Sequence, residues 1–275
     1  ESKVIVDKCL ELGINFFDTA EGYKNSESVL GRALLGRRQD AVIATKYGFR
    51  EGPTTPPYSA QDIEQAVAKS LRNLQTDYVD ILQIHYPSFI KDANETIAEL
   101  ERLRAVGKIR YYGLSNFGPK NIRDFLDAGG KPVVNQIGYN LLWRSPELGI
   151  IPECIKNGIS VLAYSPLQQG LLTGKFKKLS DVPEGRRRGK LFSKDSQICE
   201  EAGVEMSKAA LAWILQQDGL DVVISGASSA QQVVENSRII TLDSDVVRKL
   251  SEVTEPLKKK IGPTLDQWSA VDRCE

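Results

Sequence analysis

Short runs of β-branched, aromatic and other apolar residues alternate along the chain with longer stretches of mixed polarity. Such short runs, bounded by polar or turn-forming residues, predict β-strands. Several of them are almost continuously apolar, which is typical of parallel strands buried on both faces. Seven strands are predicted in this way: Asn15–Ala20, Ala41–Lys46, Tyr78–His85, Ile109–Asn116, Val133–Asn140, Ser160–Pro166 and Asp221–Ala227.

The longer stretches carry apolar residues at three- and four-residue spacing, which predicts amphipathic helices. Several of them end at Gly or Asn, a common helix stop. The chain itself opens inside such a stretch, which leads into the first predicted strand. The predicted helices are 2–13, 60–75, 93–108, 119–129, 146–158 and 206–217.

Alternation of strands and helices predicts an α/β fold with a parallel sheet and helices outside it. An open doubly wound sheet and a closed (β/α)8 TIM barrel both satisfy this pattern. Seven units without an evident second domain favour the barrel, as a single domain over residues 1–275. A complete barrel has eight strands, so the first is expected to be absent from this chain, which would leave two sheet edges.

Nucleotide-binding motifs of other folds are missing from the sequence. The Gly-x-Gly-x-x-Gly pattern of the doubly wound dinucleotide fold does not occur after an early strand. The stretch "GLLTGKF" at 170–176 is one residue too short for a P-loop, and Phe176 stands where Ser or Thr must hold a metal. A phosphate site of either kind is therefore not predicted.

Composition and charge restrict the partners and the compartment. Lys and Arg number 36, as do Asp and Glu, so no overall attraction to nucleic acid or to an anionic membrane is expected. No apolar run approaches the ~20 residues of a membrane-spanning helix, so membrane insertion is not expected. Scattered cysteines give neither a zinc motif nor a disulfide framework, which favours free thiols and a cytoplasmic protein. The cysteines are Cys9, Cys154, Cys199 and Cys274.

Ionisable groups stand at the ends of consecutive predicted strands. Asp18 ends the first strand with Tyr23 five residues later, Lys46 ends the second, and His85 ends the third. Each has an ordinary structural interpretation: a turn cap, a loop aromatic, a surface lysine or a core histidine. In a barrel, however, these positions meet at the carboxyl ends of the strands, where active sites lie. Four such groups together favour a functional site.

The chemistry of these four groups is that of a proton-donating site. An ordinary tyrosine has a pKa of ~10, and a buried ammonium beside it is expected to lower that pKa. A carboxylate keeps the ammonium of Lys46 charged and oriented, while His85 donates a hydrogen bond to a substrate oxygen. Such a site reduces a carbonyl group when a hydride comes from elsewhere.

A series of motifs in order along nearly the whole chain resembles the aldo-keto reductases. They are "FDTAEGY", "ATKYG", "VDILQIHYP", "YYGLSNF", "VVNQIGYN", "AYSPLQQGLLTGKF" and "VISGASSAQQVVEN". The resemblance implies reduction of a small-molecule aldehyde or ketone with NADP(H). It implies Tyr23 as general acid, Lys46 and Asp18 as the ion pair that tunes it, and His85 as the group that orients the carbonyl.

The resemblance also implies the positions that hold the cofactor. Ser115, Asn116 and Gln136 correspond to residues at the nicotinamide carboxamide, and Tyr164 to an aromatic residue stacked on the nicotinamide ring. Lys175 would reach the pyrophosphate. The segment around the pyrophosphate would be Ser165, Pro166, Leu167, Gln168 and Gln169, and the adenosine and 2′-phosphate end would be Gly226, Ser228, Gln232, Glu235 and Asn236.

A basic loop follows this segment, in "KFKKLSDVPEGRRRGK". A solvated surface loop explains it equally well. In the resembling family a loop here folds over the pyrophosphate, so one of Arg186, Arg187 and Arg188 would clamp it with bidentate contacts.

Departures from the family pattern leave alternatives open. Ser225 stands where many relatives have Pro, and Gln232 where some relatives place an Arg on the 2′-phosphate, which weakens a strict preference for NADPH. A non-catalytic cofactor-binding relative, such as a potassium-channel β subunit, and an inactive truncated relative are the alternatives. His85 favours the enzyme, because Asn is expected there in the channel subunits. One histidine and scattered cysteines disfavour a metal site.

Overall fold

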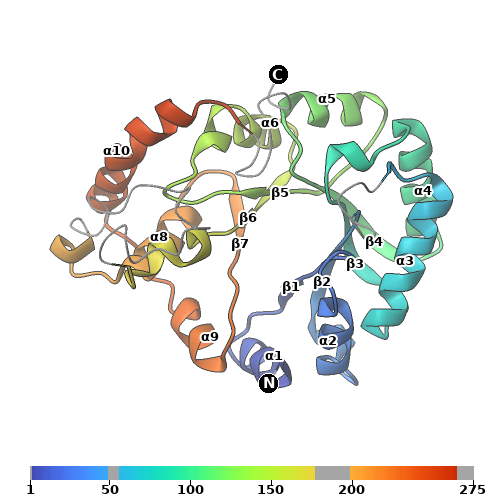
Figure 1. Cartoon of the computed structure of the whole chain (residues 1–275), viewed down its shortest axis with the longest axis horizontal. Helices are drawn as coiled ribbons and strands as arrows, with labels where there is room; N and C mark the ends of the chain where they lie inside the picture. The colour runs from blue at the N-terminus through green and yellow to red at the C-terminus, as the bar shows by residue number, and fades with distance from the viewer. Residues whose placement is uncertain (1, 49–55, 177–198, 265–275) are drawn as a thin grey trace. The chain divides into compact units, whose positions relative to one another are not determined.

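A computed structural model describes residues 2–48, 56–176 and 199–264 (Figure 1). All seven predicted strands are confirmed, with ends that differ from the predicted ones by a few residues. The differences fall at strand ends, where the chain leaves the hydrogen-bonded ladder. The strands are β1 Phe16–Asp18, β2 Val42–Tyr47, β3 Val79–Ile84, β4 Ile109–Ser115, β5 Val134–Gly138, β6 Ser160–Tyr164 and β7 Leu220–Ile224.

The predicted helices are also confirmed, with one of them divided. Gly149 separates a short 3₁₀ turn, Ser145–Leu148, from helix α6, so the predicted helix 146–158 is two elements. Three helices, α2, α9 and α10, were not predicted, and α10 contains an internal proline, Pro256. The helices are α1 Ser2–Glu11, α2 Ser26–Ala33, α3 Ala60–Leu74, α4 Ala93–Ala105, α5 Pro119–Asp127, α6 Ile150–Lys156, α8 Met206–Leu215, α9 Ala230–Ser237 and α10 Ser244–Ile261.

The chain divides into two compact units. The first contains residues 1–135 and 227–234, and the second contains residues 136–226 and 235–275. The expectation of a single domain over 1–275 stays a prediction.

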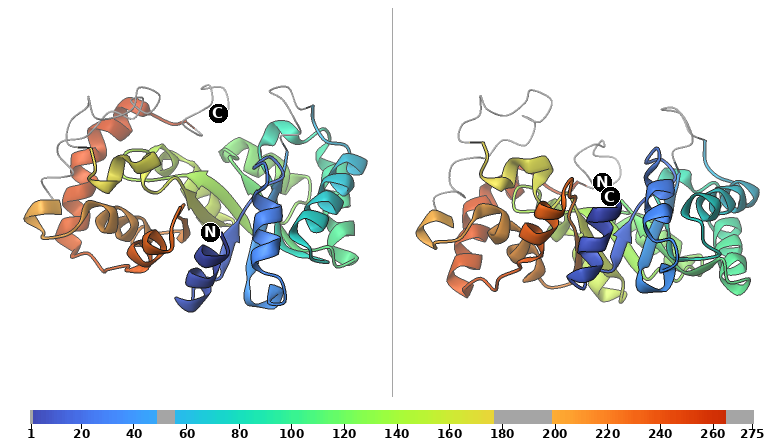
Figure 2. Two further views of the ribbon diagram at one scale, coloured as in Figure 1. Left: turned by 60° about the horizontal axis from the view of Figure 1, so that its bottom comes forward. Right: turned by 90° about the horizontal axis from the view of Figure 1, so that it is seen from below.

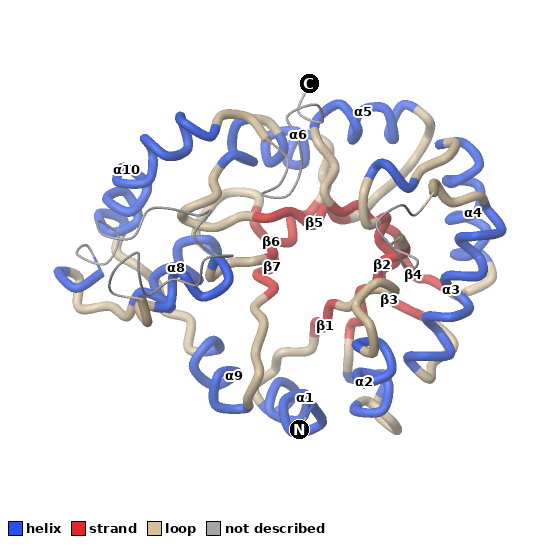
Figure 3. The backbone as a smooth tube through the Cα atoms, viewed as in Figure 1, coloured by secondary structure: helices blue, strands red, loops and turns tan. Residues whose placement is uncertain are grey.

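In the first unit, strands β1 to β4 are parallel and follow one another in chain order. The register pairs Ala44 with Ile81, and Ile81 with Tyr111. Strand β3 is buried along its whole length, as its mostly apolar sequence predicts, and the buried residues include Asp80 and Gln83. Helices α3 and α4 pack on β2 and β4 (Figures 1 and 3). All four carboxyl ends therefore lie at one edge of this sheet.

Local sequence explains why α3 forms and where it packs. Ser59 begins it with a capping box, in which the Ser59 hydroxyl accepts from the Asp62 backbone N–H and the Asp62 carboxylate accepts from the Ser59 N–H. Helix α2 lies against α3, and Gly31 makes this possible, since a Cβ there would lie 2.5 Å from the carbonyl of Leu74. Helix α1 lies beside α2 in both turned views (Figure 2).

In the second unit, strands β5, β6 and β7 follow chain order, and β6 pairs with β7 in parallel. Helix α8 is buried from Ala209 to Ile214, and the Trp213 ring stacks on Tyr139 with a centroid distance of 5.5 Å. The Arg144 guanidinium lies over Trp213 and donates hydrogen bonds to Glu147 and to the Thr254 hydroxyl of α10. These contacts attach α10 to the segment that follows β5.

Candidate functional site

Three of the predicted catalytic side chains stand at the carboxyl ends of neighbouring strands of the first unit. Asp18 is the last residue of β1, Lys46 lies near the end of β2, and His85 directly follows β3. The ladder continues one step beyond β1, because the Thr19 N–H donates to the Ala44 carbonyl at 2.9 Å. Parallel pairing thus places these side chains at one edge, as the sequence predicts.

Lys46 and Asp18 form a buried ion pair. The Lys46 Nζ lies 2.6 Å from Asp18 Oδ2 and also donates to the Thr19 carbonyl at 3.0 Å. The exposed fraction of the side chain is 0% for Lys46 and 8% for Asp18. Gln83 donates to the other Asp18 oxygen, Oδ1, at 3.3 Å. Both oxygens of the Asp18 carboxylate therefore accept a hydrogen bond, and these contacts fix the orientation of the Lys46 ammonium.

Tyr23 completes the group from the loop after β1. Its backbone N–H donates to the Ala20 carbonyl, which closes a turn and brings the ring back over the strand ends. The ring centroid lies 4.9 Å from the Lys46 ammonium and 5.6 Å from the His85 ring. The residue is 44% exposed, so a substrate has access to it. The structure thus brings all four predicted catalytic residues together.

The pKa of Tyr23 differs from the sequence-based expectation. Partial burial of Tyr23 and, after it, the charge of the Asp18 carboxylate raise the pKa of Tyr23 above its ordinary value, whereas a lowering by Lys46 was predicted. The prediction was wrong in direction, because it weighed the ammonium and left out desolvation and Asp18. Burial also lowers the pKa of Lys46, which the Asp18 carboxylate opposes. A raised pKa keeps the phenol protonated, which is the form that donates a proton.

His85 is held as a neutral imidazole. Burial, and after it the charge of Lys46, lowers the pKa of His85 to about 3. Its ring stacks on Tyr86 with centroids 5.5 Å apart. The Asn116 side-chain amide donates to the His85 backbone carbonyl at 3.1 Å, which fixes the backbone that carries the ring. A neutral ring with one N–H is suited to donating a hydrogen bond to a carbonyl oxygen.

We expect this histidine to cost stability in acid. The unfolded chain binds a proton at His85 below pH ~6.5, whereas the folded chain does so only near pH 3, so stability falls as the pH drops through that interval. Because His85 is the only histidine, its imidazole resonance is unique in a proton NMR titration. A titration midpoint near the ordinary pKa of histidine would contradict the burial argument. In His85→Gln, the free energy of unfolding measured with urea is expected to fall less as the pH is lowered.

Two of the predicted cofactor residues lie beside this group in the first unit. Ser115 ends β4 and Asn116 follows it in a left-handed conformation, with φ at +61°. The Asn116 amide donates to the Ser115 hydroxyl at 3.2 Å as well as to His85. Both residues are buried next to the candidate catalytic groups.

The other predicted nicotinamide residues belong to the second unit. Gln136 is buried within β5, and Tyr164 ends β6. A Cβ at Gly138 would lie 3.2 Å from the Tyr164 ring, so the glycine leaves room for that ring against β5. The Asn140 side-chain amide donates to the Ser165 carbonyl at 2.9 Å and to the Gln168 side chain at 2.8 Å.

The predicted pyrophosphate segment has an unusual backbone. Ser165, Gln168 and Gln169 have φ values of +53°, +44° and +53°, and Gly170 follows at +92°. Successive backbone N–H groups in turn conformations can form concave sites that are suited to binding an anion. A Cβ at Gly170 would lie 2.8 Å from the Lys175 Nζ, so the ammonium rests on this turn. Within this unit, backbone and charge both fit a phosphate group.

Residues predicted for the adenosine end fall in both units. In the second, the Asn236 amide donates to the Ser225 hydroxyl at 3.0 Å, and Gly226 and Glu235 are their neighbours in sequence. In the first, the Gln232 side-chain carbonyl accepts from the Ser228 N–H at 2.8 Å and from its hydroxyl at 3.0 Å. The predicted clamp residues Arg186, Arg187 and Arg188 lie outside the described residues.

Sequence reasoning missed two supporting side chains in the first unit and one in the second. Gln83 holds Asp18, Asn140 holds the turn at Ser165, and Glu21 is a nearly buried carboxylate beside Tyr23. Two of them could have been recognised in the sequence, because Gln83 and Asn140 are polar residues within or directly after buried apolar runs. Glu21 stands in a polar loop, where its burial has no sequence signal.

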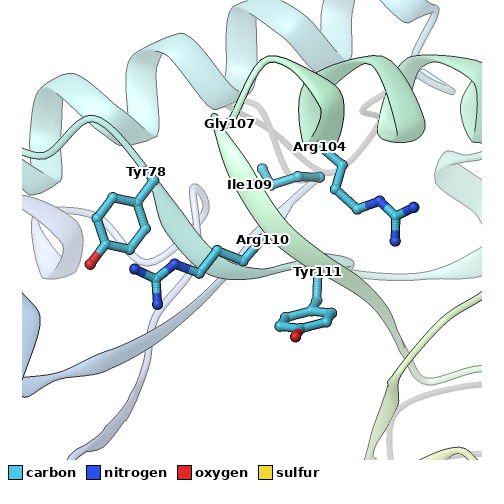
Figure 4. A pocket seen from close by; sticks show the side chains of 6 residues that line it. All are labelled: Tyr78, Arg104, Gly107, Ile109, Arg110 and Tyr111. Carbon is cyan, nitrogen blue, oxygen red and sulfur yellow. The ribbon is translucent and has the colours of Figure 1, made fainter.

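A hollow lined mostly by arginine and tyrosine lies at the other end of β4 (Figure 4). It occupies about 700 Å³, and the Arg110 guanidinium in its wall lies 4.2 Å from the Tyr78 ring centroid and pairs with Asp80. Its other lining residues are Arg104, Gly107, Ile109 and Tyr111. Because it is at the amino ends of the strands, it is separate from the candidate catalytic group.

No described helix is long and apolar enough to cross a membrane. Residues 2–48, 56–176 and 199–264 contain no group of three or more His, Cys, Asp or Glu side chains arranged to hold a metal ion.

Known proteins match this chain over most of its length. A sequence model of the Aldo/keto reductase family matches residues 1–255. The chain is 34% identical to the NADH-specific methylglyoxal reductase of Escherichia coli (strain K12), over 93% of this chain and 90% of the relative. It is 31% identical to an Arabidopsis thaliana protein named as a probable voltage-gated potassium channel subunit beta, over 94% of this chain and 89% of the relative.

A solved structure shows the same fold. The holo form of the aldo-keto reductase AKR11C1 from Bacillus halodurans matches with a TM-score of 0.78 and 32% identity, over 97% of this chain and 89% of that one. The predicted (β/α)8 fold class, with seven strands in the described part of this chain, is therefore confirmed.

Proposed function

Because the chain belongs to the aldo/keto reductase family, we propose that it reduces aldehydes or ketones to alcohols with NADP(H), with Tyr23 as the general acid. The observation that carries this proposal is the contact of Tyr23 with the buried Lys46–Asp18 pair and with His85. We further propose that the protein is cytoplasmic, since the scattered cysteines of the sequence give neither a zinc motif nor a disulfide framework.

When bound, the nicotinamide cofactor supplies the hydride. The carbonyl carbon would accept this hydride while the carbonyl oxygen takes the proton of the Tyr23 hydroxyl. The C–H bond of the hydride donor, the carbonyl π bond and the phenolic O–H bond would break, and the alcohol would gain one C–H and one O–H bond. The resulting phenolate is stabilised by the Lys46 ammonium until it takes a proton from solvent.

His85 has a different task in this proposal. As a neutral imidazole it polarises the carbonyl by a hydrogen bond and does not compete with Tyr23 as a proton source. Asn116, which holds the His85 backbone, and Ser115 would also hold the nicotinamide carboxamide. The left-handed turn from Ser165 to Gly170, with the Lys175 ammonium upon it, would hold the pyrophosphate.

The cofactor preference depends on a neutral side chain at Gln232. Its carbonyl caps Ser228, so it brings no positive charge toward a 2′-phosphate. We therefore propose that NADPH is used without a strict preference over NADH, which agrees with a relative that is named as NADH-specific.

We expect Gln232→Arg to raise the ratio of kcat/KM for NADPH over NADH by ~10-fold, because a guanidinium makes charge-assisted contacts with the 2′-phosphate. Steady-state kinetics with both cofactors measure this ratio. The matched control is Gln231→Arg, which adds the same charge one position away, about 100° around helix α9. An equal effect of both variants would show a general charge effect and contradict this assignment.

The proposed function is tested by NADPH and NADH consumption with two aldehydes, 4-nitrobenzaldehyde and methylglyoxal. The second is chosen because a 34%-identical relative is named for it. Turnover with either aldehyde supports the reductase. Quenching of protein fluorescence by NADPH without any turnover would instead support a cofactor-binding subunit, the alternative that the similarity to a potassium channel subunit favours.

A further inference from the structure

We propose that Glu21 is a positioning residue for Tyr23, and that its carboxylate fixes the proton donor relative to Lys46 and His85. This inference rests on the proposed function, because it gives a part in the same reaction to a side chain that does not touch the reacting groups. Glu21 lies two residues before Tyr23 and outside the four predicted catalytic positions.

The backbone joins Glu21 to both Tyr23 and Lys46. The Tyr23 N–H donates to the Ala20 carbonyl at 3.0 Å, so Glu21 is the second residue of a four-residue turn that ends at Tyr23. The Glu21 N–H donates to the Lys46 carbonyl at 2.9 Å. Only Gly22 separates Glu21 from the proton donor, so a displacement of Glu21 is passed directly to Tyr23.

The side chain adds a second connection to β2. It is only 4% exposed, and its Oε2 atom accepts from the Gly48 N–H at 3.3 Å and from the Tyr58 hydroxyl at 3.0 Å. Gly48 is two residues beyond Lys46. Leaving a buried carboxylate without its hydrogen-bond donors costs free energy. These bonds therefore hold the turn against the end of β2.

Gly48 and Tyr58 extend this connection to His85. Gly48 has a φ of +118°, a conformation that favours glycine, and a Cβ there would lie 3.2 Å from the His85 Cβ and 2.4 Å from the Phe89 ring. The Tyr58 N–H donates to the Phe89 carbonyl at 2.9 Å. Glu21 is thus the point at which the segments that carry Tyr23, Lys46 and His85 are joined.

The test compares Glu21→Ala with Glu21→Gln in the full chain. We expect Glu21→Ala to lower kcat by ~10- to 100-fold, because a misplacement of about 1 Å costs up to ~100-fold in rate. The Kd for NADPH, from fluorescence quenching, is expected to stay within ~3-fold, since no cofactor contact is removed. Gln keeps an acceptor oxygen for both donors, so Glu21→Gln is expected to restore kcat to within ~3-fold of the original chain.

Two further variants separate hydrogen bonding from charge. Tyr58→Phe removes one of the two donors, so its loss of kcat is expected to be smaller than that of Glu21→Ala. Lys69 lies 4.0 Å from Glu21 Oε1 and is 55% exposed, so Lys69→Ala is expected to leave kcat unchanged. A loss of kcat in Lys69→Ala equal to that in Glu21→Ala would overturn the role of the hydrogen bonds.

Thermal melting and Tyr23→Phe make the outcomes distinguishable. A merely structural Glu21 predicts a lower Tm with an unchanged kcat per folded molecule, and that result would overturn the inference. If Tyr23→Phe is inactive while Glu21→Ala keeps its kcat, the positioning role fails and the proposed function stands. If Tyr23→Phe keeps full activity, the proposed function fails and the positioning role fails with it.

Discussion

Tyr23→Phe is expected to lower kcat for aldehyde reduction by ~10²- to 10⁴-fold, the range that general acid catalysis contributes. The change removes one oxygen and keeps the ring, so the contacts with the His85 ring and with the Lys46 ammonium are retained. Stopped-flow kinetics with saturating NADPH measure the loss. Cofactor binding, measured by fluorescence quenching, is expected to be unchanged.

A matched control for this variant is Tyr111→Phe. Tyr111 is 52% exposed, close to the 44% of Tyr23, but it lies at the amino end of β4, away from the candidate catalytic group. Removal of its hydroxyl is expected to leave kcat unchanged. Activity that persists in Tyr23→Phe would mean that another group donates the proton, and the assignment of the general acid would be wrong.

The strands and their order could be predicted because buried parallel strands leave a strong pattern. Strand β3, for example, is apolar apart from Asp80 and Gln83. The predicted strand, Tyr78–His85, covers the observed one. The carboxyl-end rule then placed Asp18, Lys46 and His85 at one edge without knowledge of any helix packing. Tyr23 was included from its position in the loop after β1.

What the sequence did not reveal depends on burial and on contacts between distant segments. The spacing of Tyr23 and Lys46 predicts that they meet, but not how far burial and Asp18 outweigh the ammonium in setting the pKa of Tyr23. Glu21 is in a polar loop, and its partner Tyr58 lies far along the chain, so nothing local marks their contact. Helix α10 was not predicted; it contains Pro256, which ordinarily ends a helix, and continues to Ile261.

Lys46→Met is expected to lower the free energy of unfolding by ~3–5 kcal/mol, the usual cost of removing one partner of a buried ion pair. Lys46 has no exposed side-chain surface, and its Nζ lies 2.6 Å from Asp18 Oδ2. Met has nearly the same length, so packing is preserved while the Asp18 carboxylate loses its ammonium. Urea unfolding at neutral pH, with the slope m compared between variants, measures the change.

The double variant Asp18→Asn/Lys46→Met distinguishes a charge effect from a packing effect. It removes both charges, and Asn keeps an oxygen for the Gln83 amide, so the double variant is expected to be more stable than Lys46→Met alone. If the loss of unfolding free energy in the double variant equals the sum of the losses in the two single variants, the ion-pair argument is contradicted. Because Lys46 is also proposed to stabilise the phenolate of Tyr23, recovered stability is expected without recovered turnover. That separation would show that the pair serves the fold and the chemistry by different means.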